Sequence, residues 1–218
     1  MIKIENTEVM GWAAAIRGMR NPMNSWEKGD TFKWGIYEIS DGAPKIGPDD
    51  YDLMKRLCNA GTDHRKFMRM ITVYVDITAP LYWWKEFDTY KVGTVANSCS
   101  TMHKIHAKEF TLDDFSHEHL DHLSLELMDD IICKLNANRH EFLEYKDGDD
   151  SINSKKDFWW QMIQLLPSSY NQRRTVLLNY EVLANMYKSR KNHKLDEWHT
   201  LCDWIKTLPY AELITGDE

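Results

Sequence analysis

The sequence lacks several features that would place it in whole classes of protein. Its four cysteines, at positions 58, 99, 133 and 202, are scattered and form no CxxC or other zinc-ligand spacing. A disulfide framework is typical of much smaller secreted domains. No apolar run approaches the roughly 18–20 residues that span a membrane, and the N-terminal Met-Ile-Lys-Ile-Glu-Asn lacks the apolar core of a signal peptide. These absences predict a cytoplasmic protein with no membrane partner and no bound metal.

The sequence also has fewer basic residues than acidic ones. The chain has 27 Lys and Arg against 34 Asp and Glu, a formal net charge of −7. A protein that coats DNA or RNA needs a basic footprint, so a nucleic acid polymer is not expected as a partner. A local cationic pocket for one small anion is compatible with this balance.

The pattern of the 218 residues predicts one domain, 1–218, of the α+β class, dominated by helices around a small central sheet. Strands are expected at Ile2–Val9, Thr31–Ser40 and Ile71–Ile77. Turn residues mark Asp41–Asp50 and Asp147–Asp150 as loops. Helices are expected at Met10–Met19, from a cap at Asp49 or Asp50 to Asn59, at Ala79–Asp88, from Thr111 through a long segment after Leu120, and at Lys155–Leu166, Arg173–Ser189 and Leu195–Leu208.

The long helix after Leu120 has a clear apolar periodicity. Leu123, Leu127, Ile131 and Leu135 recur every four residues, which predicts one buried helical face. Just before it, His119 and His122 are one helical turn apart and could share a cation. The zinc-protease pattern has a different spacing, so exposed histidines at a polar helix entry are the favoured interpretation.

The segment from Asn97 to Lys104 is rich in small hydroxyls and ends in His103 and Lys104. Hydroxyl and amide donors followed by a cation suit a phosphate or a pyrimidine edge. Cys99 lies one helical turn before His103, so a thiolate nucleophile is conceivable. The alternative is a Ser/Thr-rich turn with Cys99 as a small buried filler.

Several blocks of sequence, in order, resemble the flavin-dependent thymidylate synthases. Asp52–Leu57 with Ala60-Gly61, and then Ile71–Val75, resemble the family's helix and its "FTF-x-I" strand. Leu165–Pro167 resembles "VLP", and Asn179–Met186 resembles "N-x-R-S-L-x-[HN]-F" at the family's spacing. Arg190 falls on the arginine of "LR", and His193–Trp198 stands where the family has "HAQWE". The resemblance covers roughly residues 50–105 and 160–200.

The family's signature itself is rewritten. Asp88–Lys91 occupies the arginine-histidine-arginine stretch, and only Lys91 supplies a cation there. Asn97 and Ser100 match the motif's Asn and Ser with a short insertion, while Ser98 replaces its Glu and Met102 its last Arg. Glu181 replaces the arginine that the family uses toward the flavin.

These changes remove positive charge from a site that binds phosphate and flavin in the family. Each charge-assisted hydrogen bond lost costs about 1.5–3 kcal/mol. Ordinary thymidylate synthase activity is therefore not expected, and the retained pocket is expected to hold its ligand with other groups. The cations available to compensate are Lys85, Lys91, His103, Lys104, Arg173 and Arg174. Other basic residues, including the Lys188–Lys191 group apart from Arg190, are expected on a solvated surface.

Three functions follow as hypotheses. The first is a nucleotide-binding protein, or one that senses or sequesters a nucleotide-derived signal, without a cofactor. The second is a divergent FAD-dependent enzyme that modifies a pyrimidine nucleotide such as dUMP. The third is a non-catalytic protein-interaction module that uses a surface around Trp83, Trp84, Trp159 and Trp160.

The expected ligand site has two walls, which the resemblance assigns to different subunits of a homotetramer. Asn179, Asn185 and Arg190 form one, and the segment from Asn97 to Ser100 forms the other. The complete set of expected ligand-binding residues is Lys85, Lys91, Asn97, Ser98, Ser100, His103, Arg174, Asn179, Asn185 and Arg190.

Overall fold

The computed structural model describes residues 2–32, 39–40, 42–146 and 153–216. The strands are β1 (Lys3–Met10), β2 (Ile39–Ser40), β3 (Ala43–Pro44), β4 (Thr72–Pro80), β5 (Val95–Ser98) and β6 (Asn171–Asn179). The helices are α1 (Trp12–Met19), α2 (Pro48–Asn59), α3 (Leu81–Phe87), α4 (His122–Glu144), α5 (Lys155–Leu165), α6 (Tyr180–Arg190), α7 (Asp196–Lys206) and α8 (Glu212–Thr215). Short 3-10 helices lie at Asn21–Met23, Trp26–Lys28, Lys66–Met70 and Leu112–Asp114.

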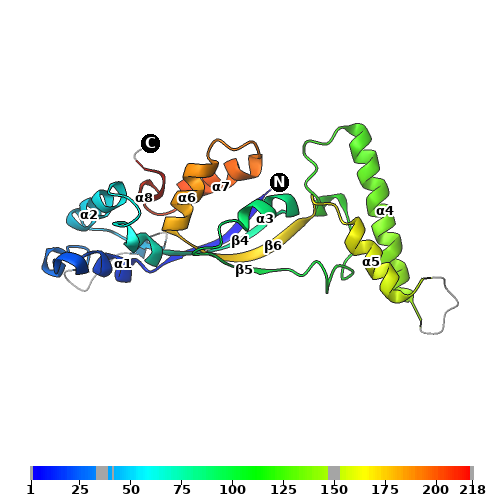
Figure 1. The fold of residues 1–218 in the computed structure, drawn as a ribbon, viewed down its shortest axis with the longest axis horizontal. Coiled ribbons are helices and arrows are strands. Elements are labelled where there is room, and N and C mark those ends of the chain that lie inside the picture. The colour runs from blue at the N-terminus through cyan, green and yellow to red at the C-terminus, as the bar shows by residue number, and fades with distance from the viewer. Residues whose placement is uncertain (1, 33–38, 41, 147–152, 217–218) are drawn as a thin grey trace. The chain divides into compact units, whose positions relative to one another are not determined.

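Four strands form the main sheet, in the order β1-β4-β6-β5 (Figure 1). The predicted strands at 2–9 and 71–77 are confirmed as β1 and β4. The predicted strand at 31–40 falls mostly outside the described residues. Its end, β2, pairs antiparallel with β3 through Ile39 and Pro44. The small sheet among many helices confirms the α+β class.

The helix predicted over 173–189 is wrong in its first half. Residues Asn171–Asn179 form β6, in which Gln172, Val176 and Leu178 are buried and the residues between them along the strand are more exposed. Such a period of two is typical of a strand, and the β-branched Thr175 and Val176 favour it. The helix begins only after Asn179, whose side chain accepts a hydrogen bond from the backbone N–H of Val182.

The predicted cap of α2 is also wrong. The N-cap residue is Gly47, and neither Asp49 nor Asp50 caps the helix. The carboxylate of Asp30, far upstream in sequence, accepts hydrogen bonds from the backbone N–H groups of both aspartates, at 2.9 and 3.0 Å. The first turn is therefore satisfied from a distant segment, which local sequence spacing does not reveal.

Contacts divide the chain into two compact units, and strands β4 and β6 contribute residues to both. Unit 1 comprises Thr78–Phe87 and Ser98–Arg174. Its core includes Phe115, Ile132, Leu135 and Met162, where α4 and α5 lie side by side (Figure 1). On α3, Trp83, Trp84 and Phe87 pack ring against ring and are buried.

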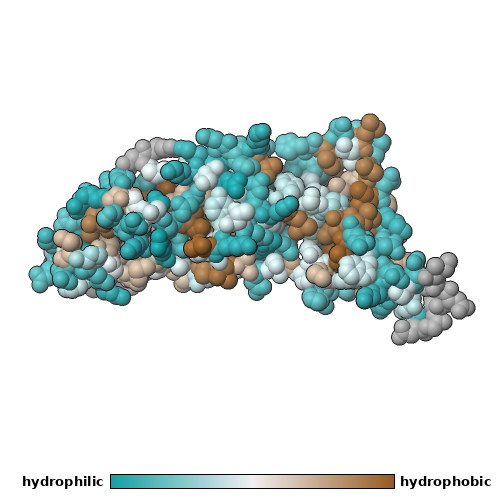
Figure 2. Space-filling model, viewed as in Figure 1, coloured by the Kyte–Doolittle hydropathy of each residue, from teal (hydrophilic) through white to brown (hydrophobic). Residues whose placement is uncertain are grey.

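The apolar face predicted for α4 is buried only in part. Leu135 is fully buried and Ile131 packs at the edge of the core, but Leu123 is 75% exposed and Leu127 is 61% exposed. The residues that α4 buries in unit 1 are Met128, Ile132, Leu135 and Asn138. The exposed leucines therefore continue the apolar stripe onto the surface (Figure 2).

Unit 2 comprises Ile2–Ile77, Asp88–Asn97 and Thr175–Glu218. Its core gathers α1, α6, α7 and α8, with Trp12 against Tyr180 at a centroid distance of 5.4 Å. The Tyr180 hydroxyl donates to the backbone oxygen of Pro209 at 2.5 Å, which fixes the segment before α8. No helix in the described ranges has the length and apolarity needed to cross a bilayer. The prediction of a single domain over 1–218 stays a prediction.

Candidate functional site

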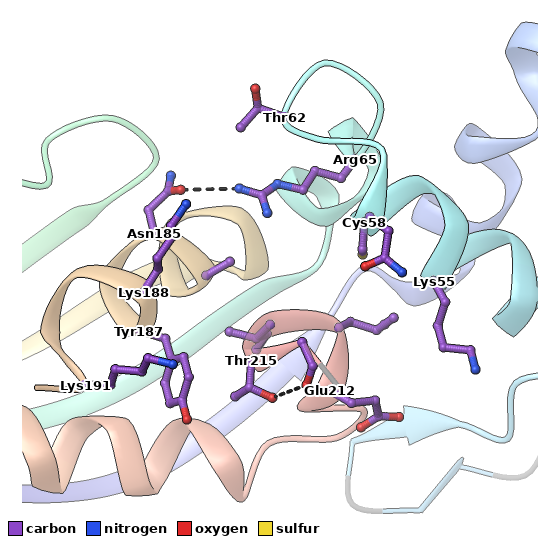
Figure 3. Close-up of a pocket in the computed structure, with 15 residues that line it drawn as sticks. Lys55, Cys58, Thr62, Arg65, Asn185, Tyr187, Lys188, Lys191, Glu212 and Thr215 are labelled. Atoms are coloured by element: carbon purple, nitrogen blue, oxygen red, sulfur yellow. Dashed lines mark hydrogen bonds between the residues drawn. The ribbon is translucent and has the colours of Figure 1, made fainter. Parts of the chain in front are cut away.

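A cavity lined by several charged side chains lies in unit 2 and is called here the cationic pocket. It has a volume of about 620 Å³, within the range of about 300–1,000 Å³ that suits small-molecule ligands. Its walls come from α2, the turn after it, α6 and α8 (Figure 3). The lining residues are Lys55, Cys58, Asn59, Thr62, Arg65, Ala184, Asn185, Tyr187, Lys188, Lys191, Glu212, Leu213, Ile214, Thr215 and Gly216.

Positive charge dominates this pocket. Lys55 on α2, Lys188 near the end of α6 and Lys191 just after it contribute three lysines, while Glu212 is the one carboxylate among the described residues of the lining. The fourth cation of the lining, Arg65, is paired with Glu181. Figure 3 shows Lys55 on one side and Lys188 and Lys191 on another. A concave surface with an excess of one sign concentrates ions of the opposite sign. The pocket is therefore suited to a small anion.

The sequence suggests that Glu181 adds a negative charge to the ligand site, but its charge is neutralised by Arg65. Its buried carboxylate forms an ion pair with Arg65, with Nε–Oε2 at 2.8 Å, and accepts from Arg65 Nη2 at 3.2 Å. The same Nη2 donates to Asn185 Oδ1 at 3.4 Å, the bond drawn in Figure 3. Arg65 is absent from the compensating cations expected from sequence, because its partner lies 116 residues away. The acidic replacement is neutralised, and the pair fixes the pocket wall that carries Asn185.

Burial also sets the protonation state of Cys58, the cysteine that lines the pocket. Loss of solvent around Cys58 raises the pKa of its thiol to about 12, against a smaller opposing effect of Arg65. The thiol lies 3.5 Å from the sulfur of Met68. Cys58 is therefore protonated at neutral pH and is no nucleophile there.

Asn179 is committed to structure rather than to the pocket. Its Oδ1 caps α6, and its Nδ2 donates to the backbone oxygen of Gly93 at 3.4 Å. Gly93 has a φ of +83°, and a Cβ there would lie 2.6 Å from Asn179 Nδ2. A side chain at position 93 would displace Asn179, so the glycine is required by this close approach.

Arg190 is braced by aromatic rings. Its Nε donates to the hydroxyl of Tyr90 at 2.9 Å, and its guanidinium lies 4.6 Å from the ring centroid of Trp198. Tyr90 belongs to the rewritten stretch Asp88–Lys91, so this stretch now orients a cation that the resemblance places in the ligand site. Lys91 and Asn97, also in unit 2, are exposed.

The remaining expected residues lie in unit 1. Lys85, Ser98, Ser100 and His103 are exposed, and Ser100 Oγ accepts from the backbone N–H groups of Met102 and His103, at 3.2 and 2.9 Å. Arg174 stacks on Trp84 at 4.2 Å, and its Nε donates to Gln172 Oε1. The structure thus divides the expected set between the two units, five residues in each.

A smaller cavity of about 290 Å³ adjoins this segment of unit 1 and is called here the mixed-charge cavity. Its lining includes Cys99, Ser100, Lys108, Asp114 and Arg173. Lys108 forms an ion pair with Asp114, and Asp113 is a second lining carboxylate. Cys99 is exposed, so it is no buried filler; its backbone N–H donates to Arg173 and its carbonyl accepts from Gln172 Nε2.

One surface prediction needs correction and another is refined. Lys188 is exposed and Lys191 is half-buried, in line with the expected solvated surface, and both line the cationic pocket. Trp83 and Trp84 are fully buried and form no interaction surface, while Trp160 is 42% exposed. The ion pair of His122 is with Glu126, and the described residues hold no cluster of three or more metal-ligating side chains.

The sequence matches no family model and no curated protein. Its fold is similar to that of thymidylate synthase X (ThyX) from Helicobacter pylori with FAD and dUMP, with a TM-score of 0.66 and 15% identity over 99% of this chain and 98% of that one. A second H. pylori ThyX structure with FAD and dUMP gives 0.63 and 15%, over 98% and 97%. The UMP/dUMP methylase PolB from Streptomyces cacaoi, bound with 5-Br dUMP, gives 0.59 and 12%, over 99% and 95%. The flavin-dependent thymidylate synthase fold expected from sequence is confirmed.

Proposed function

We propose that this chain binds a nucleotide, or a signal derived from one, in the cationic pocket and does not carry ordinary thymidylate synthase activity. The observation that carries the proposal is the charge of the pocket, three lysines and one carboxylate around about 620 Å³, beside the neutral Arg65–Glu181 pair. Phosphate groups form strong hydrogen bonds with lysine and arginine. Asn185 adds an amide that can donate to a base or sugar. Sensing and sequestration of the ligand both agree with this arrangement.

The relatives' flavin is not expected here. The resemblance places a flavin-directed arginine at position 181, and this chain offers there a buried carboxylate paired with Arg65. A flavin phosphate near Glu181 would meet a neutralised pair instead of a guanidinium. The residues present therefore do not fit FAD in the manner that the resemblance implies, and we propose a function without a cofactor.

The absorption spectrum of the protein as purified, with a mass spectrum of whatever denaturation releases, tests the proposal. We expect a colourless protein that releases a nucleotide or a related phosphate compound, or that takes one up when it is offered. A yellow protein with flavin bands supports the alternative, a divergent FAD-dependent enzyme that modifies a pyrimidine nucleotide. The similarity to structures holding FAD and dUMP favours that alternative.

A homo-oligomer, a tetramer by the resemblance, is the proposed assembly. Leu123 and Leu127 are the exposed part of the α4 stripe, and Leu143, Trp160 and Leu165 are further exposed apolar residues of α4 and α5. Apolar side chains gather over these helices in Figure 2. Exposed apolar surface of this kind is typical of a contact between proteins. We propose that a second copy of the chain covers it, and that the compartment is the cytoplasm.

Light scattering on the eluting protein tests this assembly. The variant Leu123→Glu/Leu127→Glu introduces two charges on the stripe, where they disturb no residue buried in unit 1. We expect the wild type to elute as an oligomer and the variant to shift toward the monomer mass. A monomeric wild type would contradict the proposed assembly, and a protein-interaction module would be favoured if the stripe captured a different protein instead.

A further inference from the structure

The two edge strands of the main sheet are β1 and β5. In the order β1-β4-β6-β5, each of them has one side without a neighbouring strand among the described residues. An open edge presents unpaired backbone N–H and C=O groups, to which another strand can pair. Folded proteins normally guard such an edge with charged side chains, proline or a bulge. The two edges can therefore be compared by the guards that each one carries.

The β1 edge is guarded and the β5 edge is not. Lys3, Glu5 and Glu8 lie on β1, and the Lys3 ammonium forms an ion pair with the Glu5 carboxylate at 2.8 Å. Asn6, in the same strand, has a φ of +52°, which departs from regular strand geometry. In contrast, β5 has the sequence Val-Ala-Asn-Ser, without a charged residue or a proline. A second strand that pairs with β5 therefore buries no charge of this strand.

The strand β5 is also uncovered on both of its faces. All four of its residues are exposed, and successive side chains of a strand point to opposite faces, so the described residues cover neither face. Val95 is 64% exposed, and Val92, just before the strand, is 91% exposed. Valine is among the residues most often buried in folded proteins. An uncharged strand with an open edge and exposed valines is suited to a contact with another chain.

The hydrogen bonds between β5 and β6 identify which backbone groups of β5 face the open edge. The backbone N–H of Cys99, directly after β5, donates to the carbonyl of Arg173 on β6 at 3.0 Å. Because the direction of these groups alternates along a strand, the odd-numbered residues of β5 face β6 and the even-numbered ones face outward. Ala96 is the central residue of the outward positions 94, 96 and 98.

We propose that β5 pairs antiparallel with β5 of a second copy of this chain, across a two-fold axis at Ala96. Antiparallel pairing of a strand with itself is self-complementary, so one surface on each copy is sufficient. The outward positions 94, 96 and 98 are symmetric about Ala96, so each outward N–H meets a carbonyl of the other copy. This contact is separate from the one proposed at Leu123 and Leu127, and either can fail without the other. Together, two such two-fold contacts can join four copies.

Disulfide trapping tests the proposed pair on the full chain. Directly opposed residues of a hydrogen-bonded antiparallel pair have Cα atoms about 5.5 Å apart, within the range that a disulfide spans. The background is Cys99→Ser/Cys133→Ser, which removes the two exposed cysteines. In this background we expect Ala96→Cys to form a disulfide-linked dimer under mild oxidation. Glu8→Cys, at an exposed position on the guarded edge, is the matched control and should stay unlinked on a non-reducing gel.

A proline substitution tests the same pair by removing a hydrogen bond. Ala96→Pro deletes the outward N–H, and proline is tolerated on an edge strand where this group faces solvent. Light scattering should show about half the wild-type mass for Ala96→Pro, whereas Ala96→Ser keeps the N–H and should have the wild-type mass. Circular dichroism confirms that each variant is folded, and cross-linking of Ala96→Cys decides the case if Ala96→Pro unfolds.

Two results would overturn the pairing: no cross-link through Ala96→Cys, or a wild-type mass for folded Ala96→Pro. A reduced mass of Leu123→Glu/Leu127→Glu alone would then leave the α4 contact standing without the β5 contact. If both contacts exist, adding Ala96→Pro to that variant should lower its mass further, to that of the monomer.

Discussion

The cationic pocket of unit 2 and the mixed-charge cavity of unit 1 contain similar residue types in different balance. Three lysines and one carboxylate line the first, beside Arg65, which is paired with Glu181. Two cations, Lys108 and Arg173, face two carboxylates, Asp113 and Asp114, in the second. The hydroxyl-rich segment from Asn97 to Lys104 borders the balanced cavity, while the excess of lysines lines the other one. Net charge within a cavity, more than the presence of a polar motif, therefore indicates where an anion binds.

The strongest contrast concerns the ion pairs of the two regions. The Arg65–Glu181 pair has side chains only 20% and 9% exposed, whereas Lys108 in the other pair is 68% exposed. Arg65→Ala leaves a buried carboxylate unpaired and should lower the free energy of unfolding by about 3 kcal/mol. Lys108→Ala should cost less than about 1 kcal/mol, because its partner keeps the hydrogen bond from the Thr111 backbone. Urea denaturation of both variants measures the difference.

The double variant Arg65→Met/Glu181→Leu is the control for that contrast. Replacing both charges with apolar groups of similar size removes the unpaired carboxylate, so much of the lost stability should return. Equal costs for Arg65→Ala and Lys108→Ala would remove the distinction between the two regions.

The cysteines of the two cavities should also differ in their rate of alkylation, which is a smaller effect. The pKa of Cys58 is raised to about 12 by burial, so only about one thiol in ten thousand is ionised at pH 8. Cys99 in the mixed-charge cavity is exposed. Iodoacetamide should modify Cys99 at least about a hundredfold faster than Cys58. Peptide mass spectrometry measures the two rates. Labelling of Cys58 at a similar rate would show that the cationic pocket is more open than described.

The smallest expected effect concerns Arg190, one of the two arginines stacked on a tryptophan. Tyr90→Phe removes the acceptor of Arg190 Nε but keeps its stacking on Trp198, and should cost about 1 kcal/mol of stability or less. In unit 1, Arg174 stacks on Trp84 and its Nε donates to Gln172 Oε1. Thermal denaturation of Tyr90→Phe and of the wild type measures the cost. A loss several times larger than this would contradict the assignment.

Periodicity in the sequence was sufficient for most helices and for β4, whose buried residues alternate along the strand. The prediction of β1 was also confirmed, although only Val9 of this strand is buried. It failed at Arg173–Asn179, where two arginines and the following helix obscured a period of two. Asp30 capping α2 and Arg65 neutralising Glu181 were also missed, since both join segments distant in sequence. The cations of the cationic pocket likewise come from separate helices, and only the tertiary fold brings Lys55 near the end of α6.

Isothermal titration with dUMP, UMP and ADP tests the nucleotide site most directly. Two variants each reverse the charge of one lysine: Lys188→Glu in the cationic pocket and Lys108→Glu in the mixed-charge cavity. We expect the wild type and Lys108→Glu to bind at least one of these nucleotides alike, and Lys188→Glu to bind it about tenfold or more weakly. Equal affinity in Lys188→Glu and wild type, or no binding by the wild type, would contradict the assignment of the nucleotide to this pocket.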